Sequence, residues 1–301
     1  MRSTTSGITF RLAPAAALLL VTGCVSVPED LAVRSESGES RALSMTSPGC
    51  PDRDSEGSGR PESTASTGRP DSLGEQFTLI NWNMLKGRRG GWADDLVTHR
   101  GDGDLIVLQE AYLTDELREL LGRDNYRWKL ATAFRLKEVD AGVMTASKVA
   151  PSGTCAQRSR EPILKLPKSM LITEYRVGDG SRTLLVANIH SINFSLGTTA
   201  FSEQLRQLAR NLSTHRGPVV VSGDFNTWSK ARQRALDAAL ADAALFRIVF
   251  DQDKLKTVFG KPLDHVYYRD LDLMEFKAIP VASSDHNPMR VTFRLHPAGP
   301  Q

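Results

Sequence analysis

The sequence lacks most of the motifs that mark common catalytic sites. Its 301 residues include three cysteines, Cys24, Cys50 and Cys155, and these do not have the paired spacing of a zinc site. A glycine-rich P-loop and the Gly-x-Ser-x-Gly turn of a nucleophile elbow are both missing. These absences argue against structural zinc, P-loop nucleotide hydrolysis and serine-hydrolase chemistry.

Repeats, aromatic residues and clustered positive charge are also scarce. No internal repeat is visible, aromatic residues make up 7% of the chain, and the net charge is +3. We find no extended basic stretch with interleaved aromatics, which a surface that tracks a nucleic-acid backbone would carry. A long apolar loop for entering a bilayer is missing as well. Residues 76–301 carry a net charge of +6 once the N-terminal segments are set apart, which suits an anionic substrate.

The N-terminus has the pattern of an export signal. Arg2 and Arg11 supply positive charge, and residues 12–21 form an apolar segment too short to span a bilayer as a helix. It closes with Val-Thr-Gly-Cys at 21–24, which resembles a bacterial lipobox. We therefore predict a lipoprotein signal peptide over residues 1–23 and acylation of Cys24, which would hold the exported protein on a membrane at its periplasmic or extracellular face. The alternative is an ordinary signal peptide with a chance cysteine.

Residues 24–75 are predicted to be a disordered tether. Serine, glycine, proline and charged residues dominate, aromatics are absent, and ten acids stand against five arginines. Such a composition buries too little apolar surface to offset its ordering entropy. Cys50 lies in this segment. An exported protein permits a disulfide between Cys50 and Cys155, and the sequence leaves that pairing open.

Residues 76–297 are predicted to form one domain, with a short tail at 298–301. About 220 residues are ample for a large single core. Strand-like runs fall at residues 77–83, 105–109, 142–147, 169–176, 183–189, 218–222, 266–268 and 289–295. Helical patterns lie between them at 114–121, 198–214 and 229–240, with Thr114 and Ser229 as N-caps. Strands that alternate with helices predict an α/β sandwich.

Short polar clusters occur at the ends of these predicted strands. They include Asn83, Gln109-Glu110, His190, Asp224 with Asn226, Asp264, and the run Ser-Ser-Asp-His-Asn-Pro at 283–288. Asn, Glu, His and Asp gathered at strand ends indicate a hard-metal, phosphate-handling site assembled from distant parts of one domain. Judged singly, each has a plainer interpretation, such as an Asx turn at Asp224 or a solvated acid at Glu110.

The clusters are suited to particular steps of phosphodiester cleavage. Glu110 fits the main ligand of a divalent ion, since one or two carboxylates suffice for Mg²⁺. Asp224 and Asn226, two apart after an apolar strand, can orient and deprotonate a water. Imidazolium at His190 or His286 can stabilise phosphate oxygens. The loop after Asn83 carries Lys86, Arg88, Arg89 and Trp92, which are suited to contacting substrate phosphates.

Taken in order, these residues resemble the endonuclease/exonuclease/phosphatase superfamily, the deoxyribonuclease I-like group, over residues 76–296. The resemblance implies a four-layer α/β sandwich of two packed mixed sheets with a divalent-metal site at their shared edge. It implies metal binding by Glu110, with Asn83 and Asp285 in the shell, and water activation by Asp224 beside Asn226. His190 and His286 would contact the scissile phosphate, and Asp264 would hold His286. Residues 142–148 resemble the family's central strand, which would place Lys148 near the site, with Lys86 and Arg88 as further substrate contacts.

These observations favour a Mg²⁺-dependent phosphodiesterase, with Mn²⁺ as a substitute, that acts as an endonuclease-like, membrane-anchored monomer. Two alternatives remain open. One is the same chemistry on a lipid or small-molecule phosphoester, and the other is a catalytically inactive binding lipoprotein. A domain that had lost its activity during evolution would be expected to have replaced several of the polar site residues, and this sequence retains all of them.

Overall fold

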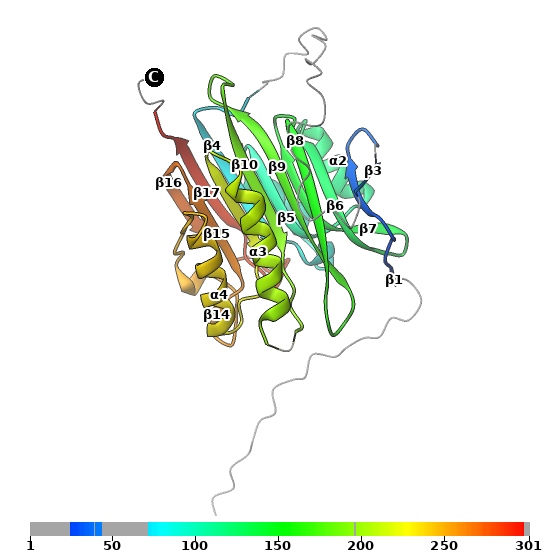
Figure 1. Ribbon diagram of the computed structural model, residues 1–301. Coiled ribbons are helices and arrows are strands. Elements are labelled where there is room, and N and C mark those ends of the chain that lie inside the picture. The colour runs from blue at the N-terminus through cyan, green and yellow to red at the C-terminus, as the bar shows by residue number, and fades with distance from the viewer. Residues whose placement is uncertain (1–24, 39, 44–71, 196, 298–301) are drawn as a thin grey trace, which may run out of the picture.

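The computed structural model describes residues 25–38, 40–43, 72–195 and 197–297. Two β-sheets pack face to face, and helices cover the outer face of each sheet (Figure 1). This helix–sheet–sheet–helix order is the four-layer α/β sandwich that the sequence predicted. Among the described residues, no helix is both long enough and apolar enough to cross a membrane.

The larger sheet has the strand order β16-β17-β4-β5-β7-β6-β2-β3, and β1 also pairs with β6. Strands β4 and β5 are parallel, and the other pairs are antiparallel. In chain order the strands are β1 Val25–Ser26, β2 Leu31–Ser35, β3 Ser40–Leu43, β4 Gln76–Asn83, β5 Leu105–Tyr112, β6 Arg127–Leu136, β7 Val139–Ser147, β16 Leu271–Ala278 and β17 Met289–Leu295.

The smaller sheet has the order β12-β15-β11-β10-β9-β8, with β10 and β11 parallel. Its strands are β8 Gly153–Arg160, β9 Pro167–Val177, β10 Arg182–His190, β11 Val219–Asp224, β12 Phe246–Arg247 and β15 Asp264–Arg269. A separate hairpin joins β13 Thr257–Val258 to β14 Lys261–Pro262, just before β15 begins.

The main core lies between the two sheets. Leu79 and Val107 of the larger sheet belong to one buried cluster with Val186 and Val220 of the smaller sheet. The run Val219, Val220 and Val221 is fully buried because the strand is covered by the other sheet on one face and by helices on the other. Covering both faces explains why the central strands read as continuous apolar runs.

Each helix packs one row of apolar side chains against a sheet. Helices α3 (Thr199–Ser213) and α4 (Lys230–Ala241) cover the smaller sheet, and Phe201, Leu205 and Leu208 of α3 are fully buried there. Helices α1 (Trp92–Arg100) and α2 (Asp115–Arg123) pack on the larger sheet. Full burial of one such apolar side chain, as at Phe201 or Leu205, contributes about 1.5–3 kcal/mol to the stability of the fold. Two short 3₁₀ helices, η1 (Leu85–Gly87) and η2 (Gln252–Lys254), lie in loops.

The predicted helix starts are confirmed. The hydroxyl of Thr114 accepts a hydrogen bond from the backbone N–H of Leu117, and that of Ser229 accepts one from Arg232. Each cap satisfies a backbone donor that the helix itself leaves unpaired. Three long strands, β6, β8 and β16, and helix α1 were not predicted. Strand β8 is polar and β16 is largely exposed, so neither carries the apolar run that marks a buried strand.

The predicted disordered tether is wrong for residues 25–38 and 40–43. Leu31 and Val33 of β2 are buried against Ala131 and Val143 of the sheet. The Arg34 Nε atom lies 3.1 Å from Oδ2 of Asp140, and the Arg158 guanidinium donates to the carbonyl of Pro28 at 2.7 Å. The apolar run at 31–33 is too short to predict a strand by itself. The segment forms a strand because the neighbouring strands bury its few apolar side chains, which its composition alone does not predict.

The boundary at residue 76 also shifts, because Leu73 is buried in the main core and bridges to Val177. Cys155 is disulfide-bonded. Cys24, Cys50 and residues 298–301 lie outside the described residues, so acylation of Cys24 and the role of Cys50 stay predictions.

Candidate active site

All but one of the site residues predicted within the domain meet at one edge of the sandwich, which we call the site edge. Asn83 ends β4, His190 ends β10 and Asp224 ends β11, while Asp264 begins β15. The parallel pairing of β10 and β11 sets His190 opposite Asp224. His286 lies in the loop before β17, whose first residue, Met289, pairs with Asn81 of β4. Strand direction in the two sheets therefore brings together residues from opposite ends of the domain.

Asp224 is the centre of the site, and its side chain is 3% exposed. Its Oδ2 accepts a hydrogen bond from the Asn83 side-chain amide at 3.0 Å, and its Oδ1 accepts one from the backbone N–H of Asn226 at 2.9 Å. Nε2 of His190 lies 3.4 Å from the same Oδ2. A buried carboxylate held by a hydrogen bond on each oxygen is fixed in one orientation.

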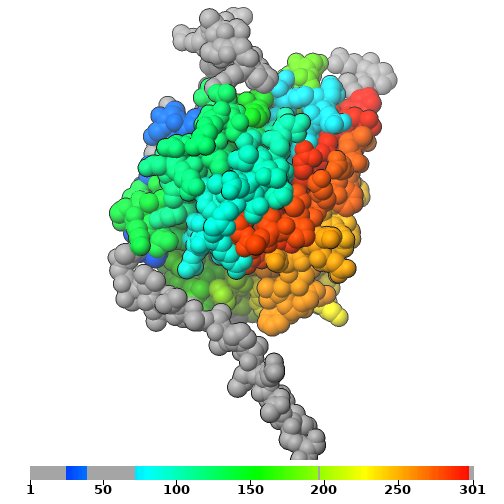
Figure 2. Space-filling model, turned by 180° about the vertical axis from the view of Figure 1, so that it is seen from behind, coloured from blue at the N-terminus to red at the C-terminus, as the bar shows by residue number. Residues whose placement is uncertain are grey.

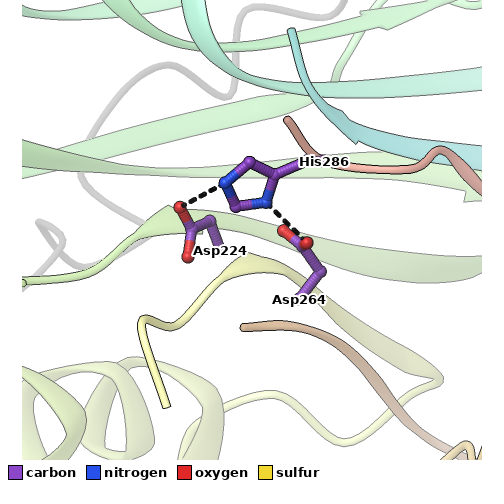
Figure 3. Close-up of side chains that lie close together, drawn as sticks. All are labelled: Asp224, Asp264 and His286. Atoms are coloured by element: carbon purple, nitrogen blue, oxygen red, sulfur yellow. Dashed lines mark hydrogen bonds and ion pairs between the residues drawn. The ribbon is translucent and has the colours of Figure 1, made fainter. Parts of the chain in front are cut away.

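His286 lies between two buried carboxylates (Figure 3). Its Nδ1 donates to Oδ2 of Asp264 at 2.7 Å, and its Nε2 is 3.8 Å from Oδ2 of Asp224. Burial alone would lower the pKa of His286, but Asp264 and Asp224 together raise it to about 10. His286 is therefore a cation at neutral pH, and Asp264 fixes which nitrogen faces the centre of the site.

His190 has the opposite character. It is buried, and the Lys168 ammonium lies 2.9 Å from its Nε2. Burial, reinforced by Lys168, lowers the pKa of His190 to about 3 against the smaller opposing effects of Asp224 and Glu110. The ring is neutral at physiological pH, so Nε2 can accept a hydrogen bond from the lysine. The sequence interpretation treated the two histidines alike, and the structure gives them different charges.

Glu110 lies within β5, not after it. The pairing of β5 with β7 shifts register between Leu108 and Ala111, and Glu110 has a positive φ of 49° at this bulge. The bulge turns the carboxylate toward Lys86, which forms an ion pair with it. Burial alone would raise the pKa of Glu110, but Lys86, His190 and Lys168 lower it to about 2. The carboxylate is ionised throughout the physiological range.

Several residues to which the sequence analysis gave no role of their own hold this arrangement. Ser284 donates to the carbonyl of Asn83 at 2.7 Å and accepts from the N–H of His286. The indole of Trp82 donates to the carbonyl of His286 at 3.1 Å. Arg232 of α4 is buried and donates to the carbonyl of Asn226 at 2.7 Å. Asn226 itself donates to the carbonyl of Ser191 at 3.0 Å and has a φ of 51°.

Two predicted residues lie on the surface near this cluster. Asp285 is exposed in the loop that holds the buried Ser284 and His286, and Arg88 is exposed in the loop after Asn83. Neither is drawn into the buried cluster around Asp224.

The placement of Lys148 near the site is wrong. Its ammonium donates to the carbonyl of Asp124 at 2.7 Å and lies 4.0 Å from the centre of the Tyr126 ring. Lys148 follows the C-terminal end of β7, which runs antiparallel to β5 and pairs Ser147 with Leu105 at the start of β5. It is therefore at the edge opposite the site.

The donor set fits a hard divalent cation. Glu110 is ionised, and the side-chain oxygen of Asn83 accepts a single hydrogen bond, from Leu85, which leaves a lone pair. Oxygen ligands of this kind, one carboxylate among them, suit Mg²⁺. Asp224, Asp264 and His286 also offer ligand atoms within 4.8 Å of one another. Because Nδ1 of His286 is hydrogen-bonded to Asp264 and its Nε2 faces Asp224, we assign that trio to proton and charge handling.

Comparisons with known proteins agree with this geometry. Residues 80–286, more than half of the chain, match the model of the endonuclease/exonuclease/phosphatase family. Among solved structures, a family protein from Beutenbergia cavernae is similar with a TM-score of 0.58 and 19% identity, covering 73% of this chain and 72% of that one. The human nocturnin catalytic domain with bound sulfate is similar with a TM-score of 0.56 and 16% identity, covering 75% of this chain and 96% of that one.

A mannosyl-6-phosphatase from Bacteroides thetaiotaomicron is also similar, with a TM-score of 0.56 and 15% identity over 72% of this chain and 99% of that one. At these identities the structural matches establish the deoxyribonuclease I-like fold, and the family match covers the strands that carry Asn83, Glu110, His190 and Asp224. The chain belongs to the endonuclease/exonuclease/phosphatase family.

Proposed function

We propose that this protein is a divalent-metal-dependent phosphodiesterase, most consistent with an endonuclease-like activity, that works outside the cytoplasm on a lipid anchor. Its family consists typically of metal-dependent phosphoesterases and nucleases that act on phosphodiester substrates. The observation that carries the proposal is the buried Asp224, held by Asn83 and Asn226 between a neutral and a protonated histidine.

Asp224 is the group that prepares the nucleophile. Its Oδ2 accepts from Asn83, and its Oδ1 accepts from the backbone of Asn226, so the carboxylate cannot rotate away from the site. A water beside it would be oriented by Oδ2 and would lose its proton there as its oxygen bonds to phosphorus. The bond from phosphorus to the ester oxygen breaks in the same step, and the alkoxide that leaves takes a proton from solvent. Asn83 and Asn226 act as positioning residues for this step.

His286 supplies positive charge where the phosphate gains negative charge. Its pKa of about 10 keeps both ring nitrogens protonated, one bound by Asp264 and the other facing the centre of the site. A preorganised donor in a buried site stabilises the developing charge without reorganising at that moment. Neutral His190 lies on the other side of Asp224, where its Nε2 accepts a hydrogen bond from the Lys168 ammonium.

Glu110 and Asn83 would hold the divalent ion, with Asp285 as a third proposed ligand from the neighbouring loop. Mg²⁺ is the ion we propose, with Mn²⁺ as a substitute. When bound, it would supply Lewis-acid stabilisation of phosphate oxygens. Lys86 and Arg88 would contact further phosphate oxygens from the loop after β4. The anchor is acylated Cys24, as the lipobox-like sequence suggests.

The test is a hydrolysis screen of the purified full chain with Mg²⁺, Mn²⁺ or chelator. The substrates are plasmid DNA, RNA, phosphoinositides and a chromogenic generic phosphodiester. Metal-dependent cleavage that disappears in a folded Asp224→Asn variant would support the proposal. Cleavage that persists in chelator, or that survives Asp224→Asn, would refute it.

Two other candidates share the scaffold. The first is a phosphatase or phosphodiesterase for a lipid or small-molecule phosphoester, and the structural similarity to a mannosyl-6-phosphatase supports a small-molecule substrate. Cleavage of the small ester or phosphoinositide without nicking of plasmid DNA would favour it. The second is an inactive binding lipoprotein, which would bind phosphoesters without turning any of them over.

The anchor has its own test. Cys24→Ala should leave the chain unprocessed or mislocalised in a bacterial host, while the wild-type chain should incorporate a labelled fatty acid and fractionate with membranes. Normal maturation and fractionation of Cys24→Ala would refute the proposed anchor and would have no bearing on the proposed hydrolysis.

A further inference from the structure

The site edge carries several loops besides those that hold the catalytic residues. Strand β9 begins at this edge because its Met170 pairs with Ile189 of β10, so the β8–β9 loop over residues 161–166 lies there. The β6–β7 turn lies there too, because Tyr112 near the end of β5 pairs with Ala141 of β7. Val25 pairs with Leu136 beside that turn. The first described residue, which follows Cys24 directly, is thus at the same edge as Asp224.

The β13–β14 hairpin projects from this edge with an aromatic tip. It ends two residues before Asp264, and its tip is Phe259-Gly260, between the paired Val258 and Lys261. Figure 1 places β14 at the lower end of the molecule, and Figure 2 shows the gold segment that contains the hairpin at the lower edge from behind. The Phe259 side chain is 85% exposed, the highest value among the large apolar residues described.

The backbone at the tip makes this phenylalanine unusual. Phe259 has a φ of 51° and Gly260 a φ of 69°, so both central residues of the two-residue turn are left-handed. Such turns favour asparagine, aspartate or glycine at these positions, because a Cβ is strained there. The exposed ring makes no packing contact that would offset this backbone strain, so it does not stabilise the fold. Residues held in strained backbone conformations cluster at functional sites.

Other apolar side chains are exposed on the same edge. They come from four separate segments: Val25 and Val27 at 42% each, Ile163 at 52%, Phe194 at 49%, and Val258 of the hairpin at 39%. The β8–β9 and β10–α3 loops that carry Ile163 and Phe194 are tied together by buried Glu161, which accepts from the backbone N–H of Phe194 at 3.0 Å. A single exposed apolar residue is ordinary, but several on the loops around one site mark an interaction surface.

The approach to the hairpin carries lysines. Lys254 and Lys256 are exposed and Lys261 is partly exposed, against the exposed acids Asp251 and Asp253. On the other loops the exposed cations (Arg88, Arg89, Lys137 and Lys165) balance the exposed acids (Glu29, Asp30, Glu138 and Asp285). Lysines that flank an apolar tip match a surface with anionic headgroups above an apolar interior.

We propose that the site edge binds the surface of an anionic lipid bilayer, with the Phe259 hairpin entering the interfacial region beside the catalytic centre. Aliphatic side chains such as Val25, Val27 and Ile163 gain by entering lipid, whereas they give no stacking platform for nucleic-acid bases. The position of Val25 adds a reason that rests on the proposed anchor, because the residue proposed to carry the lipid immediately precedes it. This inference goes beyond hydrolysis, since it concerns where the site lies and not what it cleaves. If both hold, phosphoesters at a membrane surface are the substrates within reach.

The test uses tryptophan as a depth probe in the full chain. Phe259→Trp is compared with Phe246→Trp, an exposed β12 position that lies away from the site edge and is 68% exposed. Each protein is reconstituted with vesicles of phosphatidylcholine and phosphatidylglycerol, with and without bromine on the acyl chains. The emission that Phe259→Trp adds to the wild-type spectrum should shift to shorter wavelength and be largely quenched by brominated lipid, while the emission that Phe246→Trp adds should not.

Three outcomes of the vesicle experiment would overturn the proposal. They are equal quenching of the two variants, no quenching of Phe259→Trp on vesicles that carry the protein, and no attachment to the vesicles. Quenching of the Phe259→Trp emission by single-stranded DNA instead of brominated lipid would assign the edge to nucleic acid, and so would also overturn it. Adding Asp224→Asn to Phe259→Trp should leave lipid quenching unchanged, which separates failure of this proposal from failure of the proposed hydrolase. Thermal melting confirms that each variant is folded.

Discussion

His286 and Asp264 form a buried ion pair, with Nδ1 of the imidazole 2.7 Å from Oδ2 of the carboxylate. The two residues come from different sheets, because Asp264 begins β15 and His286 precedes β17. Oδ1 of Asp264 is buried without a hydrogen-bond partner among the described residues, so the carboxylate depends on His286 for its compensation. Asp264→Asn should therefore lower the pKa of His286 and weaken catalysis by affecting His286 alone. An NMR titration of the ring in the variant measures the first effect.

The same pair predicts a pH dependence of stability. Burial lowers the pKa of His286, but Asp264 and Asp224 raise it above the ordinary 6.5 to about 10, so protonation of this ring stabilises the fold. The contribution is complete below pH 6.5 and is lost as the pH rises to about 10. In chelator, the free energy of unfolding measured in urea should fall across this window. His286→Asn should flatten that fall, and an unchanged slope would contradict the assigned ion pair.

Asp224→Asn should reduce turnover by roughly a hundredfold to ten-thousandfold, which is the usual worth of a positioned acid–base group. The substitution keeps the shape of the side chain, but it replaces one hydrogen-bond acceptor by a donor and removes a charge beside His286, so the melting temperature should fall while the protein stays folded. His286→Ala should cost a similar factor, and the double variant should lose much less than the product of the two losses, because both residues act on one transition state. Near wild-type turnover in a folded Asp224→Asn protein would rule out the site.

Glu110→Gln should remove metal binding. At about a hundredfold excess of ion over its dissociation constant, a bound ligand stabilises the native state by roughly 2.7 kcal/mol. The wild-type melting temperature should therefore rise on adding Mg²⁺, and that of Glu110→Gln should not. Asp285→Asn, tested in parallel, shows whether the exposed acid is also a ligand. A full Mg²⁺-dependent shift in Glu110→Gln would place the ion elsewhere.

Gly223 lets β10 and β11 approach closely beside the site. A Cβ at this position would lie 2.0 Å from the carbonyl oxygen of Ile189, and its φ of 154° is rare for other residues. Gly223→Ala should destabilise the protein by about 1–3 kcal/mol or more, because backbone atoms must shift. It should also separate His190 from Asp224. Gly122→Ala is the matched control, because a Cβ there meets nothing within 4 Å and should be neutral or stabilising.

The central strands and the polar clusters at their ends could be predicted because each is formed by residues that are adjacent in the sequence. The Val219–Val221 run, Asp224 and Asn226 occupy one short stretch of chain, and one strand direction fixes where they point. Lys168 could not be predicted as a partner of His190, because the contact depends on how the start of β9 lies beside the end of β10. Lys148 was misplaced for the same reason, since its position follows from the antiparallel direction of β7. Strand β2 was missed because β6 and β7 provide its burial.

Strand β17 lies between β16 and β4, and Phe293 pairs with Phe77 from the far end of the domain sequence. His286 enters the site on the segment that leads into this strand. During synthesis, strands β4 to β15 emerge before the segment that completes both the sheet and the cluster around Asp224. A nascent chain thus lacks the complete candidate site until β17 has docked. The topology itself delays assembly of the site until residues 286–295 have left the ribosome.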